Sequence, residues 1–157
     1  MCRIGDIVLN PFLGPRFKAA AVTTDLPLQP DKPIDFGLQQ FCRYCKKCAR
    51  ECPSKAITDG EKSFYNGYEV WKADTERCTK FRCTNQNGSG CGRCIKVCPW
   101  NKSKAWYHDA VRWAVMRFNF MRRIMVRLDD VLGYGKQDAL DKWWFDLEEV
   151  DGVLKTP

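Results

Sequence analysis

Residues 42–53 read CRYCKKCARECP, in which the cysteines are separated by two, two and three residues and a proline follows the last one. Residues 91–99 read CGRCIKVCP and repeat the two-residue and three-residue spacings. Soft thiolates bind iron, and two intervening residues let a tight loop wind around a cube of iron and sulfide. The first stretch has the spacing of the bacterial [4Fe–4S] run, whose fourth cysteine ligates a neighbouring cluster. The sequence therefore predicts two adjacent clusters that pass electrons one at a time.

The same spacing assigns ligands to each predicted cluster. We expect cluster 1 to be held by Cys42, Cys45, Cys48 and Cys98. We expect cluster 2 to be held by Cys52, Cys91, Cys94 and one cysteine from further upstream.

Two cysteines could supply that last ligand. Cys78 is preferred because it follows a stretch that we expect to be ordered, residues 71–74. The alternative ligand is Cys83, which lies in a polar, basic stretch that is typical of a mobile loop. Cys2 is expected to be a free thiol near the start of the chain.

Ten cysteines also allow two other interpretations. A zinc site takes four Cys or His ligands, often as paired C-x2-C units across a longer loop, and the first stretch departs from that pattern. A disulfide framework usually belongs to a short secreted chain, and no leader with a charged and an apolar region opens this sequence. Iron–sulfur clusters are therefore favoured over both.

The chain has 157 residues and a formal net charge of +7, which limits it to one or two small domains. No apolar run of about 18 residues occurs, so we expect no membrane-spanning helix and a cytoplasmic or peripheral membrane location. Basic residues lie among the cysteines, where positive charge can offset the charge of a cluster and adjust its potential. A nucleic-acid partner is the rival explanation, but no recognition motif supports it.

The expected fold class is α+β, with a ferredoxin-like domain for two clusters at residues 38–108. Before it, residues 1–37 are predicted to form strands at 7–9 and 19–24 and then a proline-punctuated arm. These strands are too short to bury themselves, so we expect them to pair with a region upstream. Inside the cluster domain, Asn66-Gly67 predicts a hairpin turn between aromatic residues.

Two tryptophans follow the last cysteine, and we expect Trp100 and Trp106 to pack over a cluster and keep water from it. The third segment, residues 109–157, is predicted to begin with a helix capped by Asp109. Its apolar residues recur at helical spacing as far as Leu128, and its arginines line the other faces. Such a helix can lie on a membrane surface, but a solvated or domain-packing face is the commoner outcome.

Gly133 and Gly135 are predicted to end that helix. An acidic tail with aromatic residues at 143–145 is then expected to fold back towards the basic helix. His108 is expected to have a capping or hydrogen-bonding role, because no Cys-x-x-Cys-His haem signature accompanies it.

Several stretches, taken in order, resemble the C-terminal part of the corrinoid-dependent reductive dehalogenases. They cover nearly the whole chain: GPR at 14–16, VTTDLPL at 22–28, CRYCKKCARECPSKAI at 42–57, NGYEVWKADTERC at 66–78, CGRCIKVCPWNK at 91–102 and KWWFDLE at 142–148.

The resemblance implies an electron path through the two clusters. An external donor, which is a ferredoxin, flavodoxin or reductase, reduces one cluster, and the other hands the electron to cobalamin. Reduced cobalt then removes halide from an organohalide. The family's W-x2-D-x3-C pattern is present at Trp71, Asp74 and Cys78, which supports Cys78 as the extra ligand.

The resemblance also implies that a corrinoid-binding, nitroreductase-like domain precedes this chain and that residues 1–37 are its truncated end. The catalytic residues, including a proton-donating tyrosine, are then expected upstream, and this chain alone is not expected to bind cobalamin. Tyr65, Tyr68 and Tyr107 lie within the cluster domain and are poor substitutes. Arg16 is the one residue expected near the corrin or the substrate.

Two alternatives remain at this stage. Epoxyqueuosine reductase is a related cobalamin-linked enzyme that acts on tRNA and shares the TDLPL and VCPWN stretches. A stand-alone ferredoxin would carry electrons without chemistry of its own, but it would not need residues 1–37.

Overall fold

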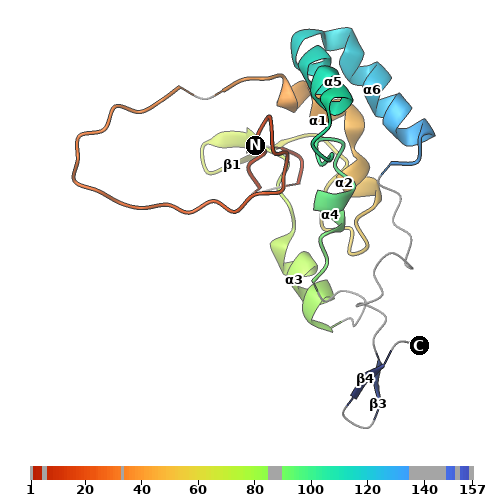
Figure 1. Cartoon of the computed structure of the whole chain (residues 1–157). Helices are drawn as coiled ribbons and strands as arrows, with labels where there is room; N and C mark the ends of the chain where they lie inside the picture. Colours follow the sequence, from red (N-terminus) through yellow and green to blue (C-terminus); the bar gives the residue numbers. More distant parts are fainter. Residues whose placement is uncertain are drawn as a thin grey trace.

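The computed structural model of the protein describes residues 2–4, 7–32, 34–84 and 90–134, and the backbone of two strands near residue 150. Short helices around the cysteine stretches form the centre of the molecule, and a helical hairpin covers one end of it (Figure 1). The sheets of the described part are small, since each has two strands. The architecture is thus a mixture of helices and small sheets.

Two consecutive helices carry the first cysteine stretch, namely α1 (Leu38–Cys45) and α2 (Lys47–Arg50). Lys46 lies between them with φ 51°, in the left-handed region that a side chain rarely adopts. This residue ends α1 and redirects the chain, so that Cys45 and Cys48 lie on separate helices. α2 packs against α4 (Arg93–Lys96), which carries Cys94 of the second stretch.

The predicted hairpin is confirmed. β1 (Ser63–Tyr65) pairs antiparallel with β2 (Tyr68–Val70), and Asn66 and Gly67 join them with φ 47° and 85°. Positive φ at both central residues is the requirement of a two-residue hairpin turn whose twist matches the strands. The hairpin ends in the buried Val70 and Trp71, which lead the chain towards α3 (Thr75–Thr84).

Residues 106–131 form a helical hairpin where a single helix from Asp109 was predicted. α5 (Trp106–Arg117) and α6 (Asn119–Val131) are separated by Phe118, whose backbone is extended (φ −119°, ψ 118°). Asp109 is therefore not the N-cap, because Ala105 occupies that position. The predicted stop after this segment is confirmed at Gly133, which follows the end of α6 with φ 70°.

Arg122 explains how the break between α5 and α6 is stabilised. Its guanidinium donates to the carbonyl oxygens of Val115 (3.1 Å) and Met116 (3.3 Å), near the C-terminus of α5. Carbonyls at the end of a helix lack partners within it, so a buried arginine can satisfy them. Arg122 is only 7% exposed, which corrects the prediction that it lies on an outer face.

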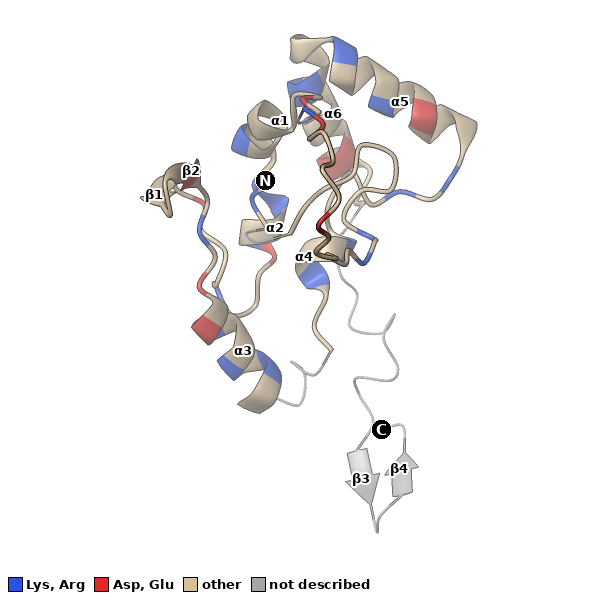
Figure 2. Ribbon diagram, turned by 90° about the vertical axis from the view of Figure 1, so that its left-hand side faces the viewer, with Lys and Arg blue, Asp and Glu red and all other residues tan. Residues whose placement is uncertain are grey.

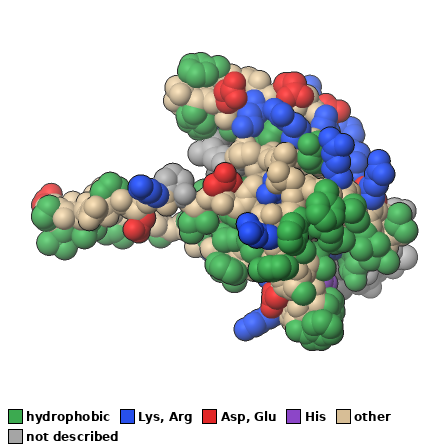
Figure 3. All heavy atoms as spheres, turned by 90° about the horizontal axis from the view of Figure 1, so that it is seen from above, with side chains coloured by type: hydrophobic (Ala, Val, Ile, Leu, Met, Phe, Trp, Pro, Cys, Tyr) green, Lys and Arg blue, Asp and Glu red, His purple; other side chains and the backbone are tan. Residues whose placement is uncertain are grey.

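The predicted strands at 7–9 and 19–24 are wrong. In the described part of residues 1–37 the only regular pairing is an isolated bridge between Asn10 and Gly14. Residues 18–32, called the arm below, are all exposed and extend away from the body of the molecule (Figures 1 and 3). An extended segment becomes a strand only where a neighbour takes its backbone hydrogen bonds, and the described residues offer the arm none.

No helix among the described residues is long and apolar enough to cross a membrane. Lys and Arg are spread over the central helices and the helical hairpin, where few acidic residues accompany them (Figure 2). The acidic aromatic tail expected to fold back, with Gly135, lies outside the described residues. The strands β3 (Glu148–Val150) and β4 (Val153–Lys155), which were not predicted, pair antiparallel.

Candidate iron–sulfur centre

The four cysteines predicted for cluster 1 line one enclosed space in the core. This space is bounded by residues near the N-terminus, by α1, by the start of α2 and by the loop after α4, and Cys2 lines it beside Cys42, Cys45, Cys48 and Cys98. Phe41 and Trp100 close the same space. Trp100 packs edge-on against Phe41 (ring centroids 5.8 Å apart) and against Phe36 (5.2 Å), so aromatic side chains shield the cysteines from water, as predicted for Trp100.

Burial sets the acidity of these four thiols. It raises the pKa of Cys42 to about 12 and that of Cys45 to about 11, and it also raises the pKa values of Cys48 and Cys98. After burial, the negative charges of Cys42 and Cys45 raise the pKa values of Cys48 and Cys98 further. Four mutually repelling thiolates in a dry space require bound cations, and iron would supply that charge.

A second group forms around Cys94. Burial raises the pKa of Cys94 to about 11, and the neighbouring thiolates of Cys91, Cys52 and Cys78 raise it as well. These are the four residues predicted for cluster 2, including the preferred upstream ligand. Cys83 is not among the largest of these influences on Cys94.

Cys52 differs from its partners because hydrogen bonds stabilise its thiolate. Burial opposes its ionisation, but the Ser54 hydroxyl, 3.4 Å from the Cys52 sulfur, and the backbone N–H groups of Ile57, Ala56 and Ser54 outweigh it. The pKa of Cys52 is therefore lowered. The turn after Pro53 thus prepares this sulfur to act as an anionic ligand.

The position of Cys78 follows from the start of α3. The Asp74 carboxylate accepts the backbone N–H of Arg77 at 2.8 Å, which is the bond of an N-terminal cap. The backbone N–H of Asp74 donates to the Ala56 carbonyl (2.8 Å), which ties this cap to the loop after the first cysteine stretch. Cys78 lies in the next turn. Cys83 was expected in a loop but lies near the end of α3, exposed.

The two groups adjoin each other. The charge of Cys94, in the second group, also acts on Cys48, in the first, and the helices that carry them pack together. Within the described residues, no three His, Cys, Asp or Glu side chains converge closely enough to hold one metal ion.

Other predicted residues lie elsewhere. Trp106 is 82% exposed, so the expectation that it covers a cluster is wrong. Arg16 is exposed and donates to the Lys102 carbonyl (2.8 Å), and His108 bonds the Ser103 carbonyl through Nδ1 (2.9 Å). Cys2 is buried at 1% exposure and lines the same space as the four cysteines of cluster 1, and its role as a free thiol stays a prediction.

Sequence analysis missed one residue beside the first group. Arg3 is buried and donates to the carbonyl oxygens of Cys42 (3.1 Å), Thr58 (3.1 Å) and Gly60 (2.9 Å), and it lies over the ring of Trp71. Its partners are 39 or more residues away in sequence. No local pattern could have indicated this role.

Comparison with known proteins gives this geometry a family context. Residues 41–101 match the model of a 4Fe-4S double cluster binding domain. These residues contain all eight predicted cluster ligands. The match agrees with the two adjoining groups of cysteines.

Individual relatives extend the similarity beyond the cluster domain. The tetrachloroethene reductive dehalogenase of Sulfurospirillum multivorans is 41% identical over 155 residues, which cover 94% of this chain and 29% of that protein. A solved structure of the catabolic reductive dehalogenase NpRdhA is 51% identical and superposes with a TM-score of 0.87, over 99% of this chain and 22% of that one. Epoxyqueuosine reductase of Leadbetterella byssophila is 34% identical over 99 residues, or 60% of this chain and 31% of that protein. The chain thus spans under a third of the length of these relatives.

Proposed function

This chain belongs to the reductive dehalogenases, whose double [4Fe–4S] domain it carries, and we propose that it serves as the electron-transfer module of such an enzyme. The single observation that carries the proposal is that the two cysteine groups adjoin, since the helices α2 and α4, which carry Cys48 and Cys94, pack together. Clusters bound there would accept and pass on one electron at a time. The similarity to dehalogenases over nearly the whole chain favours this function over epoxyqueuosine reductase, which matches a shorter part.

The ligand sets of the proposal follow the two groups. Cluster 1 is held by Cys42, Cys45, Cys48 and Cys98, and cluster 2 by Cys52, Cys78, Cys91 and Cys94. The chemistry of the residues fits this assignment, since each group offers four thiols, and all of them except the exposed Cys78 are buried or partly buried. In cluster 2, Cys78 is favoured over Cys83 because its charge acts on Cys94.

The proposed domain division has the cluster domain at 38–108, which contains the matched residues 41–101. We assign it a ferredoxin-like fold. Residues 1–37 would be the end of a preceding corrinoid-binding domain, and residues 109–157 a helical extension. The exposed arm supports the first of these assignments, because its apolar side chains would find partners in a neighbouring domain. The arm exposes Val22, Leu26 and Leu28 by 69–90%.

The activity of the whole enzyme is proposed from its relatives. The structure of one solved relative suggests a mechanism for B12-dependent dehalogenation. NpRdhA has also been solved in complex with 3-bromo-4-hydroxybenzoic acid. We therefore propose that the parent enzyme uses cobalamin outside this chain, takes electrons from an external donor and acts on an organohalide. Arg16 is exposed and available to that neighbouring domain, near the corrin or the substrate.

Iron analysis tests the two-cluster proposal. Anaerobic reconstitution of the chain should give about eight iron and about eight sulfide per polypeptide, because each cube contains four of each. The reduced protein should show the electron paramagnetic resonance signals of two interacting centres. Four iron or fewer per chain, or bound zinc alone, would contradict the proposal.

A further inference from the structure

A buried lysine lies inside the first cysteine stretch. Lys47, between Cys45 and Cys48, is 5% exposed and forms an ion pair with Asp129 of α6. Its ammonium group also lies 3.2 Å from a carboxylate oxygen of Asp130 and donates to the Tyr134 carbonyl at 2.7 Å. Lys47 is therefore held away from water by the helical hairpin.

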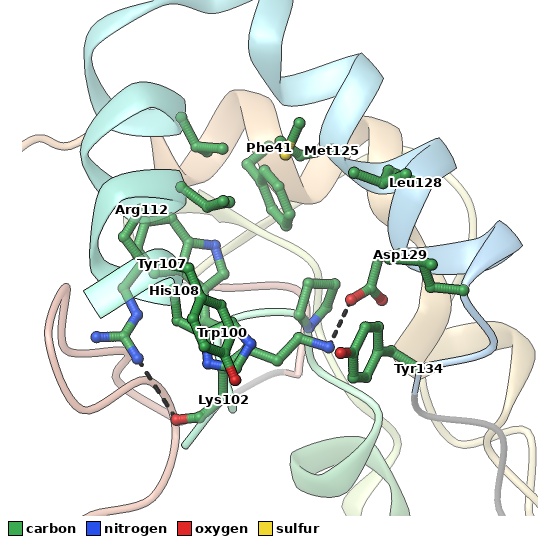
Figure 4. Close-up of a pocket in the computed structure, with 14 residues that line it drawn as sticks. Phe41, Trp100, Lys102, Tyr107, His108, Arg112, Met125, Leu128, Asp129 and Tyr134 are labelled. Carbon is green, nitrogen blue, oxygen red and sulfur yellow. Dashed lines mark hydrogen bonds and ion pairs between the residues drawn. The ribbon is translucent and has the colours of Figure 1, made fainter. Parts of the chain in front are cut away.

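Asp129 joins two lysines to each other. One carboxylate oxygen accepts Lys47, and the other lies 2.6 Å from the ammonium of Lys102 (Figure 4). Lys102 in turn lies over the ring of Tyr134, with 3.7 Å between its nitrogen and the ring centroid. The Asp129 side chain is 8% exposed, so neither water nor salt screens this charge effectively.

Both charges act on a predicted ligand of cluster 1. Lys47 lies between the predicted ligands Cys45 and Cys48 in the chain, and the buried Asp129 is paired with it, so charges of opposite sign lie beside this ligand. Lys47 and Asp129 therefore act on the same sulfur with opposite signs. Charge near a cluster is one of the means by which a protein sets its reduction potential.

We propose that Asp129 is a positioning residue that holds Lys47 against cluster 1 and partly cancels its charge, and that the pair thereby sets the potential of this cluster. The inference rests on the proposed function, because it requires a cluster at Cys42, Cys45, Cys48 and Cys98. It gives the C-terminal helix α6 a role in electron transfer, although α6 carries no cysteine.

The signs of two substitutions separate this role from a structural one. Reduction adds negative charge to the cluster, so a nearby cation raises the potential and a nearby anion lowers it. Asp129→Asn keeps an oxygen that can accept from a lysine but removes the negative charge. Lys47→Met keeps a similar length of side chain but removes the positive charge. Loosened structure that admits water would shift both potentials in the same direction.

The experiment measures the midpoint potential of each cluster in the reconstituted full-length chain by redox titration followed with electron paramagnetic resonance. Asp129→Asn should shift one cluster to a more positive potential, and Lys47→Met should shift the same cluster to a more negative one. Asp109→Asn is the matched control, since it removes an exposed acid that is paired with Arg112 on α5 (2.8 Å), and it should leave both potentials unchanged.

Equal signs for the two variants, or no shift in either, would overturn the inference. If Asp129→Asn fails to retain iron, the sign for Lys47→Met decides alone, and a zero or positive shift refutes the proposal. Wild-type protein with fewer than two clusters would instead refute the proposed function, so the two failures are distinguishable by iron content.

Discussion

At the scale of single residues, the choice of ligands for cluster 2 depends on the three-dimensional structure and not on the spacing of the cysteines alone. Cys78 and Cys83 are both exposed on α3, five positions apart, and they differ in their place along the helix. Cys78 follows the Asp74 cap by one turn and acts on Cys94. The residue at which α3 begins therefore decides which of the two cysteines lies near Cys94.

The ligand assignment predicts different outcomes for two serine substitutions. Cys78→Ser should lower the iron content from about eight to about four per chain, because cluster 2 loses one of four thiolates. Cys83→Ser is the matched control on the same helix and should retain about eight. Iron and sulfide analysis after anaerobic reconstitution measures both. The reverse pattern would assign the ligand to Cys83.

Local patterns predicted the double-cluster domain and the Asn66-Gly67 turn because both signals depend on neighbours in sequence. The partners of Lys47 and Arg3 could not be predicted in this way. Lys47 meets Asp129 across 82 residues, and Arg3 meets Gly60 across 57. Such pairs exist only once the helices have packed, and a formal charge in the sequence does not reveal its burial.

At the scale of elements, the joint between α5 and α6 depends on one buried guanidinium. Arg122 satisfies two carbonyls of α5 and also donates to the side-chain oxygen of Gln40 on α1, so it connects three helices. Gly37 leaves space for this group, because a Cβ at that position would collide with the Arg122 side chain. The sequence did not indicate the break between α5 and α6, because the residue at the break is Phe118 and not a Gly or a Pro.

Removing that guanidinium should therefore destabilise the protein. Arg122→Met leaves buried carbonyls without donors, and we expect the free energy of unfolding to fall by about 2–4 kcal/mol. Arg127→Met, on the exposed side of the same helix, should change it by less than about 0.5 kcal/mol. Urea denaturation followed by circular dichroism compares the two variants. Similar values for both would show that the joint has another origin.

The N-terminal strands failed as predictions for a reason that belongs to elements. The apolar and β-branched residues at 7–9 and 19–24 favour strands, but pairing requires a second strand. The described residues supply no such neighbour. These segments therefore have the sequence of strands but no strand to pair with among the described residues.

At the scale of the whole molecule, the centre relies on the predicted clusters. The helices α2 and α4 each have four residues, too few to be stable alone, and cysteines make up much of the core around them. Metal binding that occurs only in the folded state adds its free energy to folding. The clusters are thus expected to hold the centre together as well as to carry electrons.

Loss of iron should therefore lower thermal stability strongly. Treatment of reconstituted protein with an oxidant and an iron chelator should lower Tm by about 10 °C or more, as measured by circular dichroism under anaerobic conditions. Reconstitution with iron and sulfide should restore Tm, which controls for damage to the polypeptide. An unchanged Tm would mean that side-chain packing alone supports the centre.

The exposed arm has a practical consequence for anyone who purifies this polypeptide. Its backbone is exposed to water without strand pairing, and the apolar side chains of Val22 and Leu28 are 90% and 71% exposed. Proteases should cleave the arm before they cleave the helices. Its exposed apolar surface should also promote aggregation in concentrated samples.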